Sequence, residues 1–264
     1  MKNMFWAQRP REKEEIKEFI TNERCIIVFD TNVLLGLYRN KKKNSEQFLD
    51  LMKSYRERLK LPHQIALEFF NNREKVIQKD YIRIQRDLLE KLNKILENIS
   101  KQKNSYNEIS IKCTELGNNN ESIEDIFQRL SDLISSKIDE LETQIKKEKE
   151  HLLKDDWILK EIYKLFENKI WKGFSKNDKE KLDSEGKIRY TKHIPPGFMD
   201  SPKSEKEYEY NIYGNNNLYG DFYVWSEIIT NAKENKQDVV FVTDDEKCDW
   251  YRLDSNHRIL GPNP

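Results

Sequence analysis

Two short stretches of the chain are apolar at almost every position, and each is followed directly by acidic side chains. Residues 24–30 read RCIIVFD, and residues 237–245 read QDVVFVTDD. An apolar run that does not alternate with polar residues is typical of a strand buried on both faces of a parallel sheet. The pattern therefore predicts two buried parallel strands that end in carboxylates.

Other segments have the apolar spacing, the turn residues or the length of surface helices and shorter strands. We expect helices at residues 12–22, 33–39, 44–56, 156–171 and 221–234, and one that begins with HQIALEFF after Pro62. We expect short strands at residues 57–61 and within the final HRILGPNP, and we interpret residues 172–217 as irregular. The first and last parts of the chain together therefore predict an α/β fold.

The stretch between these parts has a different pattern. Apolar residues recur there at spacings of three and four, with charges between them, at Leu88, Leu92, Ile95 and Ile99 and again at Phe127, Leu130, Ile134, Ile138, Leu141 and Ile145. The spacing predicts two long amphipathic helices, and the Gly and Asn residues between them predict a turn. We expect a coiled-coil-like antiparallel hairpin at residues 81–154, inserted in a domain of residues 1–80 and 155–264. Packing accounts for the stripe, and a protein partner, self-association or a substrate-gripping arm are the open alternatives.

Composition narrows the class of protein. The 264 residues carry 47 basic and 47 acidic side chains, and this zero net charge gives no support for non-specific binding to nucleic-acid backbones. Cys25, Cys113 and Cys248 lie far apart, which favours a reducing cytoplasm over a disulfide framework or a zinc site. The sequence has neither a signal peptide nor an apolar run of membrane-spanning length, so we expect a cytoplasmic protein without membrane contact. The chain stops at Pro264 without a closing helix, as a fragment of a longer protein would.

The acids at the strand ends indicate a bound cation. The carboxyl ends of parallel strands face a common crevice, so Asp30 and the pair Asp244 and Asp245 converge if the two strands are neighbours. At ~4 Å two carboxylates repel by roughly 4 kcal/mol at an effective dielectric of ~20. A hard divalent cation such as Mg²⁺ takes oxygen ligands and removes this cost. The structural alternative for Asp30 is an N-cap of the helix that follows it.

Two further acids match this pattern. Glu68 lies among core-type residues in LPHQIALEFF, and Asp221 opens a predicted helix in YGDFYVWSEII. A solvated helix face is the alternative for Glu68, and an N-cap is the alternative for Asp221. The basic residues after the first motif, which are candidates for phosphate contacts or a solvated face, are Arg39, Lys41 and Lys42.

Taken together, FDTNVLLGLYR, LPHQIALEFFNNR, IPPGFMD, YGDFYVWSEII and VVFVTDDEKCDW resemble the PIN-like nuclease domains, specifically a bacterial branch with a long helical insertion. The resemblance covers roughly residues 24–80 and 190–262. It implies an α/β/α sandwich with a parallel sheet and an acidic cluster that binds Mg²⁺ or Mn²⁺. It also implies cleavage of phosphodiester bonds, usually in RNA.

The resemblance also implies roles for single residues. The implied metal ligands and catalytic residues are Asp30, Glu68, Asp221 and Asp245. The usual spacing places the last acid two residues after Thr243, which favours Asp245, with Asp244 as its rival. Asn32 and Thr243 would orient the carboxylates. The metal would lower the pKa of a bound water and neutralise the charge that develops on the phosphate.

Three other functions compete with this interpretation. A phosphatase with a nucleophilic aspartate needs a second Asp two residues on, and position 32 is Asn, which argues against that class. A flap-type DNA nuclease uses a related acidic cluster, although its richer set of acids is not evident in the sequence. A degenerate PIN-like scaffold that acts through the helical hairpin is the non-enzymatic alternative, and the retained acids argue against it.

Overall fold

The structure, a computed structural model, describes residues 12–22, 24–80, 83–110, 123–200 and 217–263. The chain divides into two compact units. The first consists of residues 1–37, 41–73 and 158–264, and the second of residues 38–40 and 74–157.

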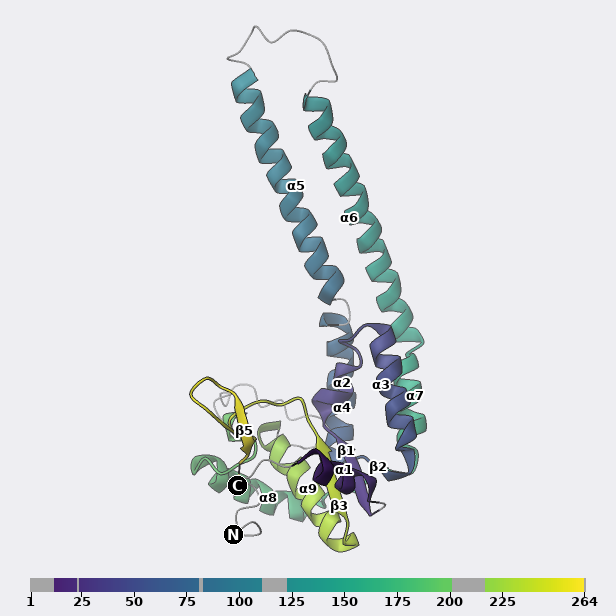
Figure 1. Cartoon of the computed structure of the whole chain (residues 1–264), viewed down its shortest axis with the longest axis vertical. Coiled ribbons are helices and arrows are strands. Elements are labelled where there is room, and N and C mark those ends of the chain that lie inside the picture. Colours follow the sequence, from purple (N-terminus) through teal and green to yellow (C-terminus); the bar gives the residue numbers. More distant parts are fainter. Residues whose placement is uncertain (1–11, 23, 81–82, 111–122, 201–216, 264) are drawn as a thin grey trace. The chain divides into compact units, whose positions relative to one another are not determined.

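A three-stranded parallel sheet lies in the first unit (Figure 1). Its strands, in the spatial order β2-β1-β3, are β1 (Cys25–Phe29), β2 (Leu59–Lys60) and β3 (Asp238–Val242). The central strand β1 is buried at all five positions, as its uniformly apolar sequence predicts. Phe29 pairs with Val242 at the last rung, so Asp30 and Thr243 leave the sheet at the same edge.

Helices of the α/β part supply the rest of the core. Their bounds are α1 (Lys13–Thr21), α2 (Thr31–Gly36), α3 (Lys42–Ser54), α4 (His63–Lys79), α7 (Trp157–Phe166), α8 (Lys176–Thr191) and α9 (Gly220–Asn235). Leu34, Leu49, Ile65 and Ile158 are among the fully buried side chains that these helices contribute. They come from segments that the sequence pattern predicted as helices.

Several short elements complete the first unit. β4 (Tyr251–Leu253) and β5 (Ile259–Pro262) form a separate antiparallel pair near the end of the chain. Among the described residues, 3-10 turns lie at η2 (Arg56–Arg58), η3 (Phe198–Asp200) and η5 (Asn217–Tyr219).

The second unit contains a long helical hairpin. It is made of α5 (Arg83–Ser110) and α6 (Ile123–Lys154), which have 28 and 32 residues and run antiparallel to each other (Figure 1). The predicted α/β fold with a parallel sheet and an inserted helical hairpin is therefore confirmed. No helix in the described parts of the chain combines the length and the apolar character needed to cross a membrane.

Two predictions of local structure were wrong, and one strand was not predicted. Helix α8 occupies much of the region interpreted as irregular, and it gave no apolar signal because Gly186 and Tyr190 are its only buried residues. Its start is fixed instead by Ser175, whose Oγ accepts a hydrogen bond from the Asp178 N–H over 3.2 Å. The strand expected at residues 57–61 is shortened because η2 takes up its first part. Strand β4 was not predicted at all.

Candidate active site at the carboxyl ends of the strands

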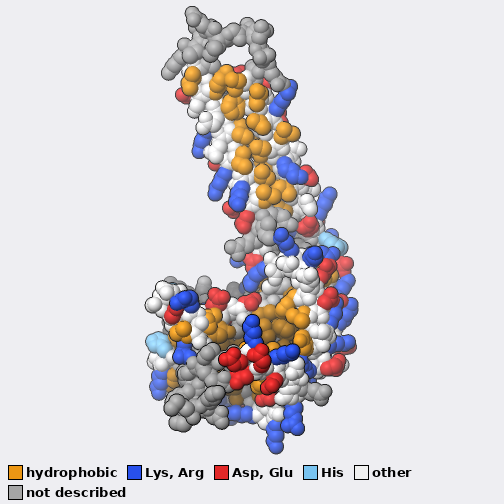
Figure 2. Space-filling model, viewed as in Figure 1, with side chains coloured by type: hydrophobic (Ala, Val, Ile, Leu, Met, Phe, Trp, Pro, Cys, Tyr) orange, Lys and Arg blue, Asp and Glu red, His pale blue; other side chains and the backbone are white. Residues whose placement is uncertain are grey.

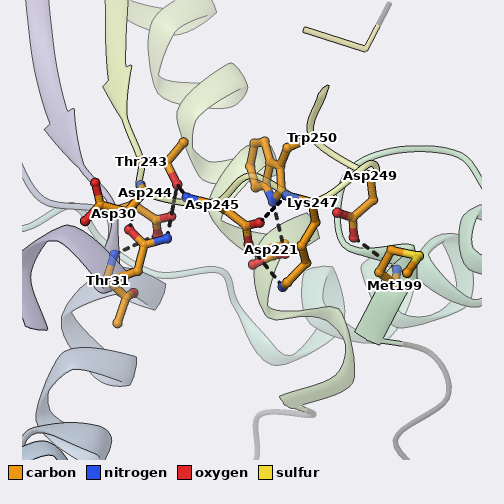
Figure 3. Close-up of polar contacts among 11 residues, drawn as sticks. Asp30, Thr31, Met199, Asp221, Thr243, Asp244, Asp245, Lys247, Asp249 and Trp250 are labelled. Atoms are coloured by element: carbon orange, nitrogen blue, oxygen red, sulfur yellow. Dashed lines mark hydrogen bonds and ion pairs between the residues drawn. The ribbon is translucent and has the colours of Figure 1, made fainter. Parts of the chain in front are cut away.

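Asp30 joins the ends of β1 and β3. Its Oδ2 accepts a hydrogen bond of 2.6 Å from the Thr243 hydroxyl, and its Oδ1 accepts one of 2.7 Å from the Thr31 N–H (Figure 3). The Asp30 N–H donates to the Val242 carbonyl over 2.8 Å and so extends the strand ladder by one residue. Both carboxylate oxygens and the main chain of Asp30 are therefore held at the edge where the two strands end.

Asp30 is also the N-cap of α2, which was the structural alternative for this residue. Burial raises the pKa of the Asp30 carboxyl, while the hydrogen bonds from Thr243 and Thr31 lower it. The negative charge of Asp245 raises the Asp30 pKa further. An ionised Asp30 therefore costs free energy in the folded protein, and a cation placed beside it would reduce that cost.

Thr243 is the centre of the hydrogen bonds at this edge. Its Oγ1 accepts from Asn32 Nδ2 over 3.1 Å and from the Asp245 N–H over 3.0 Å. Asn32 Oδ1 in turn accepts from the Asp244 N–H over 3.1 Å. The two residues expected to orient the carboxylates thus hold Asp30 and the turn after β3 in one network.

The two rival acids after β3 lie in different surroundings. Asp245 has a side chain that is 13% exposed, and its Oδ2 lies 3.0 Å from Lys247 Nζ. Its Oδ1 accepts a hydrogen bond of 2.8 Å from the Lys247 N–H. Asp244 is exposed, and its Oδ2 lies 3.8 Å from the position of a Cβ built on Gly36. Asp245 is the acid whose charge acts on Asp30, which favours it over Asp244.

Glu68 of α4 is linked to the same edge through α2. Its Oε2 accepts a hydrogen bond of 3.0 Å from the Thr31 hydroxyl, and its Oε1 accepts one of 2.8 Å from Gln64 Nε2. The start of α9 closes over it, since a Cβ built on Gly220 would lie 2.6 Å from Glu68 Oε1. The solvated-face alternative for Glu68 is therefore wrong.

Asp221 lies in the first turn of α9, whose N-cap is Tyr219, so the N-cap alternative for Asp221 is wrong. Its Oδ2 accepts a hydrogen bond of 3.2 Å from Trp250 Nε1. Figure 3 shows the Asp221 side chain beside those of Asp245 and Lys247. The turn that follows β3 thus brings an indole donor and a carboxylate to the start of α9.

Asp249 is a buried acid that the sequence analysis missed. Its side chain is fully buried, and its Oδ2 accepts a hydrogen bond of 3.0 Å from the Met199 N–H. Its Oδ1 has no hydrogen-bond partner among the described residues, and burial raises the pKa of this carboxyl. The signal that could have found it was the third aspartate in VTDDEKCDW, five residues after Asp244.

Glu227 of α9 is a second buried acid without a role in the sequence analysis. It is 3% exposed, and its Oε2 accepts a hydrogen bond of 3.2 Å from the Gln64 N–H in the first turn of α4. Burial raises the pKa of Glu227 to about 7, and the charge of Glu68 also raises it. Nothing in WSEII distinguishes this glutamate from one on a solvated helix face, so the sequence held no signal for it.

Two of the three basic residues named after the first motif, Arg39 and Lys42, already have acidic neighbours. Arg39 Nε lies 3.0 Å from Asp80 Oδ2, both in the second unit. Lys42 Nζ lies 3.9 Å from Glu46 Oε1, one turn further along α3. Lys41 is the exposed N-cap of α3. These contacts fit the solvated-face alternative as well as they fit a role in binding phosphate.

The acidic residues are linked one to the next through shared hydrogen-bond partners, and they do not surround a single point. Asp30 and Asp245 share Thr243, and Thr31 connects Asp30 to Glu68. Among the residues that the structure describes, no group of three or more His, Cys, Asp or Glu side chains is spaced to hold a metal ion.

The chain was also compared with known proteins. The family described as PIN like domain matches residues 26–264, a range that includes both acid-ended strands and the helical hairpin. No match was found among curated proteins or among solved structures. PIN-like domains are generally nucleases, which act on nucleic acids. Because the match spans almost the whole sequence, the chain belongs to the PIN-like domain family.

Proposed function

We propose that this protein is a metal-dependent endonuclease that hydrolyses phosphodiester bonds in RNA. Its acidic residues would be Asp30, Glu68, Asp221 and Asp245. The observation that carries the proposal is the pair of aspartates that follow neighbouring parallel strands and share the Thr243 side chain. A fold requires no such pair of carboxylates, because their mutual repulsion is unfavourable.

The donor atoms suit Mg²⁺ or Mn²⁺. Asp30 and Asp245 offer oxygen atoms only, which are the ligands that hard cations take. Mg²⁺ usually keeps several waters and needs only one or two carboxylates from the protein in addition to substrate phosphates, so this pair is a sufficient donor set. When bound, such an ion lowers the pKa of a water and stabilises charge on the phosphate.

The surrounding residues would set the positions of the acids. The Thr243 hydroxyl fixes one oxygen of Asp30, and its oxygen atom fixes the main chain of Asp245. Thr31 orients Glu68 through its hydroxyl, and Trp250 orients Asp221 through its indole N–H. Each carboxylate therefore has a donor that limits its rotation, as a site that must present oxygen atoms in a fixed geometry requires.

The proposal extends to basic residues near the site and to the compartment. Lys41 and Lys42 are exposed at the start of α3, where they could contact substrate phosphates. Arg39 is a weaker candidate because of its ion pair with Asp80. We also propose that the protein acts in the cytoplasm, since Cys25 and Cys248 are free thiols.

The substitution Asp30→Asn tests the proposal. Asparagine caps a helix about as well as aspartate, so α2 should be retained while the negative charge is removed. We expect the rate of cleavage of labelled single-stranded RNA in Mn²⁺ to fall at least ~100-fold, the scale on which such site partners act. The melting temperature should stay the same or rise, because the repulsion from Asp245 is removed.

The matched control is Asp238→Asn, which makes the same change at the other end of β3 and should leave cleavage unchanged. Full metal-dependent cleavage by Asp30→Asn would show that Asp30 acts only as a helix cap. Cleavage of single-stranded or flapped duplex DNA, but not of RNA, would replace the proposed substrate. If no substrate is cleaved and Mg²⁺ does not change the melting temperature, the domain is a scaffold.

A further inference from the structure

Asp249 joins two segments of the first unit that are distant in the sequence. We call residues 193–200 the proline loop and residues 243–250 the acid turn. Asp249 Oδ2 accepts a hydrogen bond of 3.0 Å from the N–H of Met199, which lies 50 residues earlier in the chain (Figure 3). A side chain of the acid turn therefore holds the main chain of the proline loop.

The burial of Asp249 sets it apart from most acidic residues of this protein. Figure 2 shows acidic side chains at the surface, where water solvates them. Asp249 is instead fully buried, and its Oδ1 has no hydrogen-bond partner among the described residues. Burying a carboxylate with one oxygen unpaired is unfavourable for folding. Packing alone therefore does not account for an aspartate at this position.

The proline loop packs against Asp221. Gly197 has a φ of 86°, and a Cβ built on it would lie 2.8 Å from Asp221 Cβ. A side chain at position 197 would therefore displace either the loop or Asp221. The next residue of the loop, Phe198, packs against a cluster of buried aromatic residues, which are Tyr190, Tyr219, Phe222 and Tyr223. Because this cluster includes residues on both sides of Asp221 in the sequence, the loop covers the start of α9.

The acid turn also contacts Asp221. Trp250 follows Asp249 directly, and its Nε1 donates a hydrogen bond of 3.2 Å to Asp221 Oδ2. The Trp250 ring is held in turn, since its centroid lies 5.5 Å from that of Phe241 and 6.1 Å from that of Trp225. Asp221 is therefore in contact with both of the segments that Asp249 joins.

We infer that Asp249 is a positioning residue for Asp221. Its hydrogen bond holds the loop that contains Gly197 against the turn that contains Trp250, and these two residues contact Asp221. The inference rests on the proposed function, because it assigns Asp249 to the support of a proposed metal ligand. Residues that support a ligand in this way typically change the affinity for the metal by about 10- to 100-fold.

Isothermal titration calorimetry with Mn²⁺ alone tests the inference without a need for cleavage. Asp249→Ala removes the acceptor for the Met199 N–H, so we expect the Mn²⁺ dissociation constant to rise at least about tenfold. Asp249→Asn keeps an oxygen acceptor and should bind Mn²⁺ within about threefold of the wild type.

The matched control is Asp156→Ala in the second unit. It removes another buried aspartate, whose Oδ2 accepts a hydrogen bond of 2.7 Å from the Tyr38 hydroxyl. This variant should have a lower melting temperature and an unchanged affinity for Mn²⁺.

A double-mutant cycle shows whether Asp249 acts through Asp221. Asp221→Asn should itself weaken Mn²⁺ binding, and the addition of Asp249→Ala should then weaken it by less than about twofold, because the residue that Asp249 positions is already lost. Circular dichroism checks that each variant is folded. If Asp249→Ala does not fold, Gly197→Ala disturbs the same contact from the loop and should raise the Mn²⁺ dissociation constant to a similar extent.

The possible outcomes separate this inference from the proposed function. Equal Mn²⁺ affinities of the wild type and Asp249→Ala, or of the wild type and Gly197→Ala, would overturn the inference alone, and so would additive effects in the cycle. If Asp249→Asn loses as much affinity as Asp249→Ala, the metal requires the charge of Asp249, which also excludes a positioning role. A wild type that binds no Mn²⁺ would overturn the proposed function and this inference together.

Discussion

The Thr243 hydroxyl donates a hydrogen bond of 2.6 Å to Asp30 Oδ2, joining the ends of two strands whose residues are 213 positions apart in the sequence. The same oxygen atom accepts from Asn32 and from the Asp245 N–H. One side chain thus holds two acids from distant parts of the chain in a fixed relation. If the acids bind a metal ion, Thr243 sets how closely they approach each other.

Thr243→Val should therefore impair the site more than the fold. Valine keeps the shape but removes the donor to Asp30 and the acceptor for the Asp245 N–H. We expect cleavage to fall ~10–100-fold, with a loss of about 1–3 kcal/mol in the free energy of unfolding from groups left without a partner. Loss of the donor raises the Asp30 pKa, so the acidic limb of the pH–rate profile should move to higher pH. Thr243→Ser retains the hydroxyl and should stay near wild type.

Lys247 and a bound metal cation would compete for the Asp245 carboxylate. Its Nζ is 3.0 Å from Asp245 Oδ2, so Lys247→Met should leave Asp245 freer to bind metal. Because a partly exposed ion pair contributes less than about 1 kcal/mol, we expect the Mn²⁺ concentration that gives half of the thermal stabilisation to fall about two- to fivefold. Lys233→Met, on the exposed side of α9, is the control. An unchanged Mn²⁺ titration for Lys247→Met would show that its ammonium group does not compete with the metal.

Gly220 keeps space for the Glu68 carboxylate. A Cβ at position 220 would lie 2.6 Å from Glu68 Oε1, and both Glu68 oxygens are already held by hydrogen bonds. Gly220→Ala should displace this carboxylate and lower the rate of cleavage about tenfold, by analogy with the loss of an orienting partner. The melting temperature should hardly change. Alanine favours a helix by up to about 1 kcal/mol over glycine, and this gain offsets the cost of displacing the Glu68 carboxylate.

Gly36→Ala is the matched control for Gly220→Ala. Its Cβ would meet Asp244 Oδ2 at 3.8 Å, which is an ordinary contact. Cleavage by this variant should stay at the wild-type rate. Equal activity of the two variants would show that Glu68 is not part of the catalytic site.

The central strands and the acids that follow them could be predicted from the sequence for a physical reason. β1 is buried on both faces, so each of its positions must be apolar, and Asp30 is conspicuous as the first charge after Phe29. Parallel pairing then places Asp30 and Asp245 at one edge whatever the length of the chain between them. The hairpin could be predicted because its apolar residues repeat at spacings of three and four along two long segments.

Other features had no periodic signal. Helix α8 buries only Gly186 and Tyr190, so its sequence resembles a polar loop with a capping serine. Glu227 is polar at a buried position, and its partner is the main chain of Gln64, 163 residues away. Contacts of this kind depend on how the helices are placed in three dimensions, which a local pattern does not encode.

Because of Glu227, we expect the fold to lose stability as the pH rises, which is the opposite of the usual effect of a carboxyl group. Its ordinary pKa of 4.5 is raised to about 7 in the folded protein, chiefly by burial. The folded state therefore holds the proton more tightly than the unfolded state does. The associated stability is present at pH values below 4.5, falls as the pH rises toward about 7, and stays lost above it. At about 1.4 kcal/mol for each pKa unit, the loss is about 3 kcal/mol.

Glu227→Gln should abolish this dependence, because glutamine is neutral throughout and its oxygen can still accept from the Gln64 N–H. We expect the free energy of unfolding of the variant, relative to wild type, to rise by about 2.5 kcal/mol between about pH 5 and about pH 8.5. Urea unfolding at both pH values measures this difference and cancels any constant cost of the substitution. Glu234→Gln, at an exposed position of the same helix, should show no such change. Parallel pH curves for wild type and Glu227→Gln would mean that Glu227 is ionised at little cost, stabilised by the N-terminus of α4.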